Sequence, residues 1–373
     1  MCRTNHEDCI IHPYPIRRRS RAFHYRLAKC FSALGHQVDI LAFSGRGDMR
    51  SEAHDIASVF DFEAPWWIRR MGAYLSYIWK ENPDLVIAAT SGPNMIASLV
   101  NGLLSRKRPV IISQRGWDGI GYEPQKRLKP RILQKLVRAS YTRAAALVAI
   151  SSGVADQWTH VPGIKRNRIS VIYNPVWSPE IEILAGQPVS LIWPVQKDMP
   201  VIISAGRFSS EKDFSTLIQA FAKLRKKHQA KLILLGEGSL RASLEDLAKQ
   251  LGVIDDLTMP GFVENPFAYL ARADVFVLPS LHEGFGNVLV EAMACGTPVV
   301  STNCPSGPRE ILDGGRYGAL VPVGDADALA AAIEQQFDNP TPAELLKTRA
   351  REFSVEKAAG AYLALAEDLA VQG

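Results

Sequence analysis

Two basic residues in the second half of the chain stand where a phosphate group would be bound. Arg207 and Lys212 follow the short apolar run 201–205, which predicts a strand, and they precede a helix-length amphipathic segment. A strand–helix loop that holds two cations near a helix terminus suits a diphosphate. Gly206 would let the strand turn sharply, and Asp213 is of a residue type that caps helices. An ordinary solvated loop with surface charges is the alternative interpretation.

Two carboxylates flank a glycine-rich turn further along the chain. Glu283 and Glu291 are eight positions apart, with Gly284 and Gly286 between them. Those glycines let backbone N–H groups approach a ligand closely. If Asn287 caps the following helix, Glu291 lies one turn inside it, about 6 Å along the axis, near a helix end that favours anions. A carboxylate on a helix docked against a sheet needs a partner, so we predict that both glutamates accept hydrogen bonds from ligand hydroxyls.

The second half alternates short apolar runs with amphipathic segments of helix length. The runs lie at 201–205, 232–235, 257–259, 275–278, 298–301 and 319–321. Continuous apolar runs are typical of parallel strands buried on both faces, and their alternation with helices predicts a doubly wound sheet. Ligands of such sheets bind outside the carboxyl ends of the strands. The loops with Arg207 and Glu283 leave such ends. So does a Gly-x-Gly pair at 236–238, although many α/β turns need glycine there.

The first half repeats the pattern less regularly. Its candidate strands are 38–43, 85–88, 110–113, 147–150 and 169–172. A helix is expected from Ser20 to Leu34, with Gly35 just beyond its end. Between the halves, 174–200 has five prolines and little periodicity, as a linker would. The sequence therefore predicts an α/β chain of two doubly wound, Rossmann-like domains, 1–178 and 200–353, joined by a linker at 179–199.

Composition and charge exclude several other classes of protein. The 373 residues are 47% hydrophobic and 22% charged, which argues against long disordered segments, collagen-like repeats and coiled coils. The net charge of +5 is unevenly divided: residues 1–175 hold 26 Lys and Arg against 13 Asp and Glu, and residues 176–373 hold 17 against 25. A basic half and an acidic half suggest two domains with different partners.

Several kinds of site and segment are not expected. Five scattered cysteines form no CxxC pair, which fits a reducing cytoplasm. No apolar signal-peptide core is found in the first 35 residues, and the uncharged stretch 85–105 has the polar and turn residues of a strand, a turn and a helix. Asp325 and Asp327 are better explained as helix caps than as metal ligands. We expect no metal, no cofactor and no nucleic-acid partner.

The motifs of the second half resemble a known family. Gly206-Arg207 and Lys212, followed by the segment 283–299 (EGFGNVLVEAMACGTPV), resemble the retaining glycosyltransferases of the GT-B fold, specifically glycosyltransferase family 4 (glycosyl transferases group 1). The resemblance is strong over about 200–330 and weak in the first half. It implies two Rossmann-like domains that face each other across a cleft, the first binding the acceptor and the second the nucleotide-sugar donor. It also implies a C-terminal helix, about 354–370, that returns to the first domain.

The resemblance further implies a role for each motif residue. Arg207 and Lys212 would hold the donor diphosphate and neutralise the charge of the departing nucleotide, and with Glu283 they form the expected catalytic set. Glu283 would contact the transferred sugar, Glu291 the ribose, and the turn 261–263 the base. The donor site implied in this way comprises Gly206, Arg207, Lys212, Phe262, Val263, Glu283, Gly284, Phe285, Gly286, Asn287 and Glu291. Family members retain anomeric configuration, with the donor phosphate taking the acceptor's proton.

The first half departs from the family pattern at two places. Relatives begin with a strand and a glycine-rich loop; this chain has the short apolar run 9–11, followed by Arg17 and Arg18 among four closely spaced arginines. A replaced loop that binds phosphate through arginine, a divergent N-terminus and a start site that misses the true first strand all remain open. Where many relatives place a histidine, this chain has Arg115 and Asp118. These two residues either contact donor or acceptor anions or serve packing and local ion pairing.

Basic groups beside tryptophans favour a membrane partner. Residues 66–70 read Trp-Trp-Ile-Arg-Arg, and 126–131 hold four cations. Such segments suit the surface of an anionic membrane, and a buried tryptophan pair is the alternative. We expect a cytoplasmic enzyme at the inner face of the membrane that moves a hexose or N-acetylhexosamine from a UDP-sugar to a glycan or lipid-linked acceptor in bacterial surface-polysaccharide synthesis. An inactive GT-B scaffold and a GT-B epimerase are the competing hypotheses.

Overall fold

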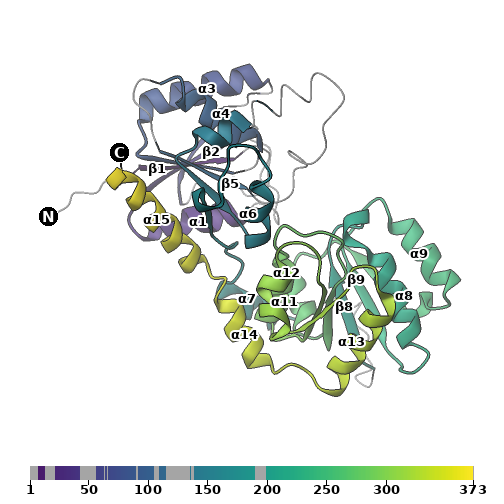
Figure 1. The fold of residues 1–373 in the computed structure, drawn as a ribbon. Helices are drawn as coiled ribbons and strands as arrows, with labels where there is room; N and C mark the ends of the chain where they lie inside the picture. Colours follow the sequence, from purple (N-terminus) through teal and green to yellow (C-terminus); the bar gives the residue numbers. More distant parts are fainter. Residues whose placement is uncertain are drawn as a thin grey trace. The chain divides into compact units, whose positions relative to one another are not determined.

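The structure is a computed structural model in which residues 7–12, 22–42, 56–62, 64, 66–89, 91–104, 109–114, 135, 138–189 and 199–372 are described. The chain divides into two compact units, one of Met1–Pro175 with Val355–Gly373 and the other of Val176–Ser354. Each unit is an α/β layer structure built on one parallel sheet (Figure 1).

The first unit is built on a seven-stranded sheet in the order β3-β2-β1-β4-β5-β6-β7, with every pairing parallel. Its strands are β1 (Glu7–His12), β2 (Gln37–Ala42), β3 (Ser58–Asp61), β4 (Leu85–Ala89), β5 (Val110–Gln114), β6 (Ala146–Ala149) and β7 (Ile169–Val171). The strand order reverses between β1 and β4, so the topological switch point of this sheet lies there. The five strands predicted for this half are confirmed.

Helices cover both faces of this sheet. They are α1 (Ala22–Ala33), α3 (Trp67–Glu81), α4 (Ser91–Asn101), α6 (Ser152–Trp158) and α15 (Val355–Gln372), with one 3₁₀ turn, η1 (Arg166–Arg168). Figure 1 shows α3 and α4 above the sheet and α1 and α15 below it. Gly35 follows α1 with a φ of +90°, the left-handed conformation expected of a helix-ending glycine.

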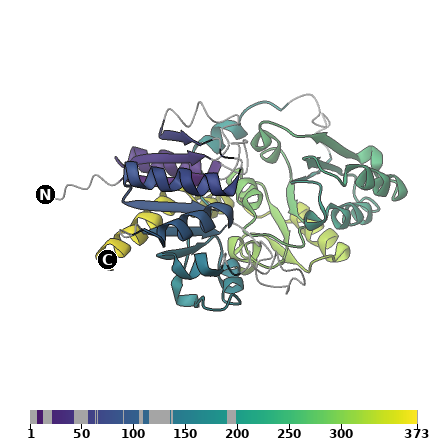
Figure 2. The ribbon, with the colours of Figure 1, turned by 90° about the horizontal axis from the view of Figure 1, so that it is seen from above.

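The last helix of the chain folds onto the first unit. Both views place α15 beside the strands of that unit (Figures 1 and 2). Its Ala358, Ala359 and Tyr362 join Leu27 and Phe31 of α1 in one buried cluster over the sheet. The Tyr362 hydroxyl also hydrogen-bonds to Ser113 Oγ at 3.0 Å. The sheet face needs this apolar cover, so the first unit is completed by the end of the chain.

The second unit is built on a six-stranded parallel sheet in the order β10-β9-β8-β11-β12-β13. Its strands are β8 (Val201–Ala205), β9 (Lys231–Leu235), β10 (Leu257–Gly261), β11 (Val275–Leu278), β12 (Val299–Thr302) and β13 (Ala319–Val321). Its helices are α7 (Glu180–Ala185), α8 (Phe214–Leu224), α9 (Arg241–Gln250), α10 (Pro266–Leu270), α11 (Asn287–Ala294), α12 (Pro308–Ile311), α13 (Ala326–Asp338) and α14 (Ala343–Arg351), with the 3₁₀ turns η2 (Ser210–Lys212), η3 (Ile254–Asp256) and η4 (Asp313–Gly315). All six strands predicted for this half are confirmed.

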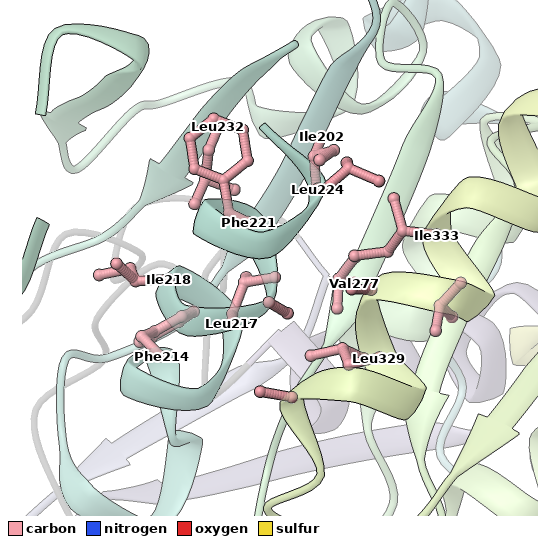
Figure 3. Close-up of a cluster of buried hydrophobic side chains, with 14 of the residues drawn as sticks. Ile202, Phe214, Leu217, Ile218, Phe221, Leu224, Leu232, Val277, Leu329 and Ile333 are labelled. Carbon is pink, nitrogen blue, oxygen red and sulfur yellow. The ribbon is translucent and has the colours of Figure 1, made fainter. Parts of the chain in front are cut away.

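The core of the second unit lies between this sheet and helices α8 and α13. Figure 3 shows Leu217 of α8 on the side of Val277, Leu329 and Ile333, whereas the Phe221 ring of the same helix lies beside Leu232 of β9. The apolar residues of α8 recur at helical spacing, so one face of the helix is buried along its whole length. Asp213 caps this helix as predicted, because its side chain accepts a hydrogen bond from the Thr216 N–H at 3.3 Å.

The boundary between the units differs from the predicted one. Residues 176–178 belong to the second unit rather than the first, because the Val176 and Trp177 N–H groups donate to the Phe353 carbonyl at 2.9 and 3.0 Å. The predicted linker also contains a helix, which its proline-rich composition did not predict. Within it, α7 is part of the second unit, where Asn265 Nδ2 donates to the Leu184 carbonyl at 2.8 Å. Residues 190–198 of that linker lie outside the described residues.

Sequence reasoning missed β3. This strand has four residues, lies at an edge of the sheet and offers only Val59 and Phe60 as apolar side chains. A short edge strand has one hydrogen-bonded neighbour and little burial, so its apolar pattern is weak.

In the described part of the chain, no helix combines the length and apolar character needed to cross a bilayer.

The Tyr362 hydroxyl offers a direct test of how α15 is anchored. We expect Tyr362→Phe to lower the free energy of unfolding by about 1 kcal/mol, because it removes one buried hydrogen bond and keeps the ring. Chemical denaturation of the full chain measures this. Tyr317→Phe is the matched control, since among the described residues the Tyr317 hydroxyl has no hydrogen bond, while its ring lies over Arg316 and Arg349. Equal stabilities of the Tyr362 variant and the parent chain would contradict the anchoring.

Candidate functional site

The strand order of the second unit brings the two predicted motifs together. The order reverses between β8 and β11, which are neighbours in the sheet. Ligands of open α/β sheets bind at such a switch point, outside the carboxyl ends of the strands. The loop with Arg207 leaves β8 and the loop with Glu283 leaves β11. The two loops are joined directly, because the Leu281 N–H donates to the Glu211 carbonyl at 2.9 Å.

An ion pair links the two loops at their functional side chains. Lys212 Nζ lies 2.5 Å from Glu283 Oε1, with the two side chains 23% and 10% exposed. The same carboxylate oxygen accepts a hydrogen bond from Ser280 Oγ at 2.8 Å. Two of the three residues predicted to be catalytic therefore meet in one partly buried cluster, in which a serine hydroxyl holds the carboxylate in place.

Buried hydrogen bonds hold the loop of Glu283 against the sheet. Ser280 is completely buried, and Thr302 Oγ1 of β12 donates to its carbonyl at 2.6 Å. The charge of Glu283 also affects the neighbouring Cys304. Burial is the main cause that raises the pKa of the Cys304 thiol to about 11, Glu283 adds to the rise, and Lys212 opposes it. The carboxylate of Glu283 thus lies in a region of restricted solvent access, where electrostatic interactions are stronger than in water.

Arg207 lies at the exposed side of the same loop. Its side chain is exposed, and among the described residues it makes no salt bridge. Its charge is nevertheless felt locally. The Ser209 hydroxyl, the backbone N–H of Glu211 and the charges of Lys212 and Arg207 lower the pKa of the Glu211 carboxyl. Sequence reasoning assigned no role to Glu211, which places an anion between the two cations and limits their repulsion when no ligand is bound.

The loop after β9 approaches the loop after β8 so closely that it must contain glycine. The Gly206 N–H donates to the Leu235 carbonyl, and the Phe208 N–H donates to the Glu237 carbonyl, both at 2.9 Å. A Cβ atom on Gly236 would lie 1.9 Å from the Gly206 oxygen, and Gly236 has a φ of +141°. The Gly-x-Gly pair at 236–238, to which the sequence gave no specific role, therefore allows the loop after β9 to pack against the loop that contains Arg207.

The turn expected to receive the base adjoins these loops. Gly261, at the end of β10, accepts a hydrogen bond from the Gly236 N–H at 2.9 Å, so the three loops lie in sequence along one sheet edge. Phe262 is 59% exposed and Val263 is half-buried. An exposed aromatic ring at the carboxyl end of a parallel strand offers a face on which a base can stack.

The segment from Phe285 to Asn287 corrects the expected helix cap and shows where the Phe285 ring lies. Asn287 does not cap α11: Gly286, with a φ of +98°, occupies the N-cap position and Asn287 is the first helical residue. The side chain of Phe285 is 2% exposed and packs edge-on against Phe353, so it belongs to the core and only its backbone can serve a ligand. The glycines on either side, Gly284 and Gly286, frame the start of the helix.

Glu291 lies one turn inside α11, as the spacing predicts, and is partly buried. Its charge reaches Cys295, one turn further on. Burial is the main cause that raises the pKa of the Cys295 thiol to about 12, Glu291 adds to the rise, and Lys347 opposes it. Glu283 and Glu291 thus stand before and within the same helix terminus, which favours an anion between them.

Other predicted residues lie outside this cluster. Arg17, Arg18, Arg115 and Asp118 fall outside the described residues. Asp325 caps α13 as predicted, because its Oδ1 accepts a hydrogen bond from the Ala328 N–H at 2.9 Å, and Asp327 pairs with Lys223 at 2.5 Å. The described part of the chain contains no cluster of three His, Cys, Asp or Glu side chains that could hold a metal ion.

Comparisons with known proteins agree with this fold and with the family resemblance. The model of the family described as Glycosyl transferases group 1 matches residues 192–353, and that of Glycosyltransferase Family 4 matches residues 23–176. The chain belongs to this glycosyltransferase family. Its two Rossmann-like units are those of the GT-B fold, and the family match includes every residue of the candidate donor site.

Two of the relatives are bacterial glycosyltransferases named for glycan or lipid-linked substrates. The chain is 38% identical, over 61% of its length and 66% of the relative's, to a lipopolysaccharide core biosynthesis glycosyltransferase, LpsE, of Rhizobium meliloti. It is 29% identical, over 69% of its length and 68% of the relative's, to a Campylobacter jejuni N-acetylgalactosaminyltransferase whose name specifies a diphospho-undecaprenol acceptor. The match thus spans about two thirds of each relative. The structure of Anabaena HepE in complex with UDP-glucose aligns with a TM-score of 0.72 at 20% identity, covering 98% and 99% of the two chains.

The close approach at Gly236 can be tested by substitution. We expect Gly236→Ala to lower the free energy of unfolding by about 3 kcal/mol or more, because the Cβ atom would overlap the Gly206 oxygen at a strained φ. Gly252→Ala is the control, since Gly252 has a φ of +69° with no atom within 4 Å of an added Cβ, and about 1 kcal/mol is expected there. Denaturation midpoints compare the two. Similar losses at both positions would mean that conformational strain alone, and not loop contact, constrains Gly236.

Proposed function

We propose that this protein is a retaining, metal-independent glycosyltransferase that moves a hexose or N-acetylhexosamine from a UDP-sugar to a glycan or lipid-linked glycan. The observation that carries the proposal is the Lys212–Glu283 ion pair at the switch point between β8 and β11, flanked by Arg207 and Glu291. It combines groups for a diphosphate with groups for sugar hydroxyls, as a nucleotide-sugar donor requires.

The chemistry proposed for the donor follows from its charge. As the bond between the anomeric carbon and the diphosphate oxygen breaks, negative charge grows on the leaving group, and Arg207 with Lys212 would stabilise it. The acceptor oxygen forms the new bond to the anomeric carbon on the same face. Its proton passes to a leaving phosphate oxygen, so the step needs no separate base. Glu283 would orient the sugar by accepting hydrogen bonds from its hydroxyls.

The ion pair between Lys212 and Glu283 has a role in this scheme. Lys212 is held by Glu283 at 2.5 Å, and Ser280 donates to the same oxygen of Glu283. When a diphosphate arrives, Lys212 can turn toward it while Ser280 continues to hold the carboxylate. Glu291 would bind the ribose and Phe262 the base, which extends the donor along the sheet edge from β8 to β10.

Support for the acceptor class comes from the relatives and from charge. The similar Rhizobium and Campylobacter proteins are named for lipopolysaccharide core and undecaprenol-linked glycans. Residues 1–175 have twice as many basic as acidic side chains, which suits a phosphorylated acceptor and an anionic membrane. We therefore propose action at the cytoplasmic face of the cell membrane in surface-polysaccharide synthesis, with Arg17, Arg18, Arg115 and Asp118 on the acceptor side.

The donor assignment predicts the effect of two substitutions on UDP binding. We expect Arg207→Ala and Glu291→Ala each to weaken UDP affinity roughly 10- to 100-fold in calorimetry, the loss of one charge-assisted hydrogen bond. Lys226→Ala is the matched control, because Lys226 is an exposed cation of the same unit that follows the C-terminal end of α8. Affinities unchanged by both substitutions would refute the donor site.

Turnover separates an enzyme from the alternatives. We expect release of UDP from at least one UDP-sugar by the purified protein, faster with acceptor, and a product with the donor's anomeric configuration by NMR. Lys212→Ala should lower turnover more than it lowers UDP affinity, because the charge on the leaving group grows only in the transition state. An inactive scaffold would bind UDP without any turnover, and an epimerase would change the sugar in the absence of acceptor.

A further inference from the structure

The helix α3 presents an apolar stripe to solvent. Ile68 and Trp79 are 76% and 83% exposed, and Leu75 between them is also exposed. Leu75 and Trp79 follow Ile68 by seven and eleven residues. At 3.6 residues per turn, the three side chains lie within about 20° of one line along the helix. This line, the apolar stripe, is about 16 Å long. Trp66 and Trp67, 72% and 41% exposed, lie beside its N-terminal end but off this line, because they immediately precede Ile68 in the chain. The tryptophan pair is therefore not buried.

The opposite face of α3 already holds the helix in the fold. Tyr74, Tyr77 and Ile78 are buried. The Tyr77 hydroxyl donates to Asp39 Oδ2 at 2.8 Å, and its ring packs edge-on against Phe60 at 5.1 Å between centroids. The stripe is thus not needed for packing within the described part of the first unit. Together with the exposed Trp66 and Trp67 beside its N-terminal end, the stripe forms an apolar patch of the kind that marks a protein or membrane interaction site.

Basic residues accompany the stripe. Arg69 and Lys80 are exposed near its two ends, whereas Arg70 turns back so that its Nε donates to the Ala64 carbonyl at 2.8 Å. Glu81 is the one acidic residue of the helix. Tryptophan at the ends, aliphatic residues between them and flanking cations are the composition of a helix that lies in the interface of an anionic bilayer.

The size of the stripe favours a bilayer over a second copy of the chain. Three tryptophans that are 41–83% exposed offer on the order of 400 Å² of aromatic surface. With Ile68 and Leu75 added, the stripe still falls short of the ~800 Å² that each partner of a stable protein interface buries. A lipid surface, in contrast, accepts a single narrow helix face together with its flanking charges.

We propose that the outer face of α3 docks the protein on an anionic phospholipid surface, with the helix axis parallel to the membrane plane. The N-terminal end of α3 follows β3, so Trp66 and Trp67 lie toward the sheet edge at which β1, β4 and β5 end. That is the edge where this unit binds ligands. The benefit of this docking rests on the proposed function, because a docked α3 would bring this sheet edge to a lipid-linked acceptor.

The test is sedimentation of the full chain with phosphatidylcholine vesicles, with and without phosphatidylglycerol. We expect binding only to the anionic vesicles, reduced by added salt because the charges are screened. The double variant Ile68→Ser/Trp79→Ser should bind about tenfold more weakly or worse, since it removes buried apolar surface. Arg69→Gln/Lys80→Gln should weaken binding at low salt and little at high salt. Leu34→Ser is the control: Leu34 is exposed on the same unit, just after α1 on the opposite face of the sheet.

Two results would overturn the proposal. One is equal vesicle binding by the parent chain and the Ile68/Trp79 variant. The other is a dimer in analytical ultracentrifugation that this variant abolishes, which would make the stripe an interface between copies. UDP calorimetry without vesicles distinguishes the proposals, because both α3 variants should bind UDP as the parent chain does. A parent chain that binds vesicles through α3 but binds no UDP would refute the donor site and leave the docking surface standing.

Discussion

The Lys212–Glu283 contact depends on the topology of the second sheet. The two residues are 71 positions apart, and their charged atoms lie 2.5 Å apart because β8 and β11 are neighbours where the strand order reverses. No local motif could bring them together. The remaining candidate groups are arranged around this contact: Ser280 fixes the carboxylate, Glu211 lies between the cations, and α11 points its N-terminus at the same region. The proposed donor site is therefore a property of strand order, and each loop supplies half of it.

A steric constraint accompanies the electrostatic one. The loops after β8 and β9 run so close together that the Gly236 and Gly238 positions leave no room for a Cβ atom, and the Gly307 position likewise meets the Phe285 carbonyl. Close backbone approach leaves N–H groups near the surface of the sheet edge, where they can face a ligand without intervening side chains. These glycines therefore do not act chemically. They set how near two chain segments come, and so determine where Arg207 and Glu283 can be placed.

Sequence reasoning found most of the fold because continuous apolar runs in a parallel sheet are strong signals, and β8, β9, β11 and β12 are buried along nearly their whole length. It missed the edge strand β3 and took α7 for a linker, since short elements bury too little to leave a pattern. At the site it named Arg207, Lys212, Glu283 and Glu291, but it placed Asn287 rather than Gly286 at the N-cap of α11 and gave no position for the Phe285 ring. A phenylalanine between two glycines gives no sign of which way its ring turns, because the pocket that receives it comes from Phe353, distant in sequence.

The uneven charge of the chain can be related to the ion pairs of the second unit. In the acidic second unit most cations are neutralised structurally: Asp256 pairs with both Arg225 and Lys231, and Arg241 lies between Glu237 and Glu245. Lys212 is paired with a residue of the site itself, while Arg207 remains exposed and, among the described residues, without a salt bridge. Arg207 is therefore a cation whose charge no described salt bridge neutralises, and it stands at the switch point of the sheet. In a unit with more acidic than basic residues, such a cation favours an anion at the proposed donor site over the rest of the surface, which a uniformly basic surface would not do.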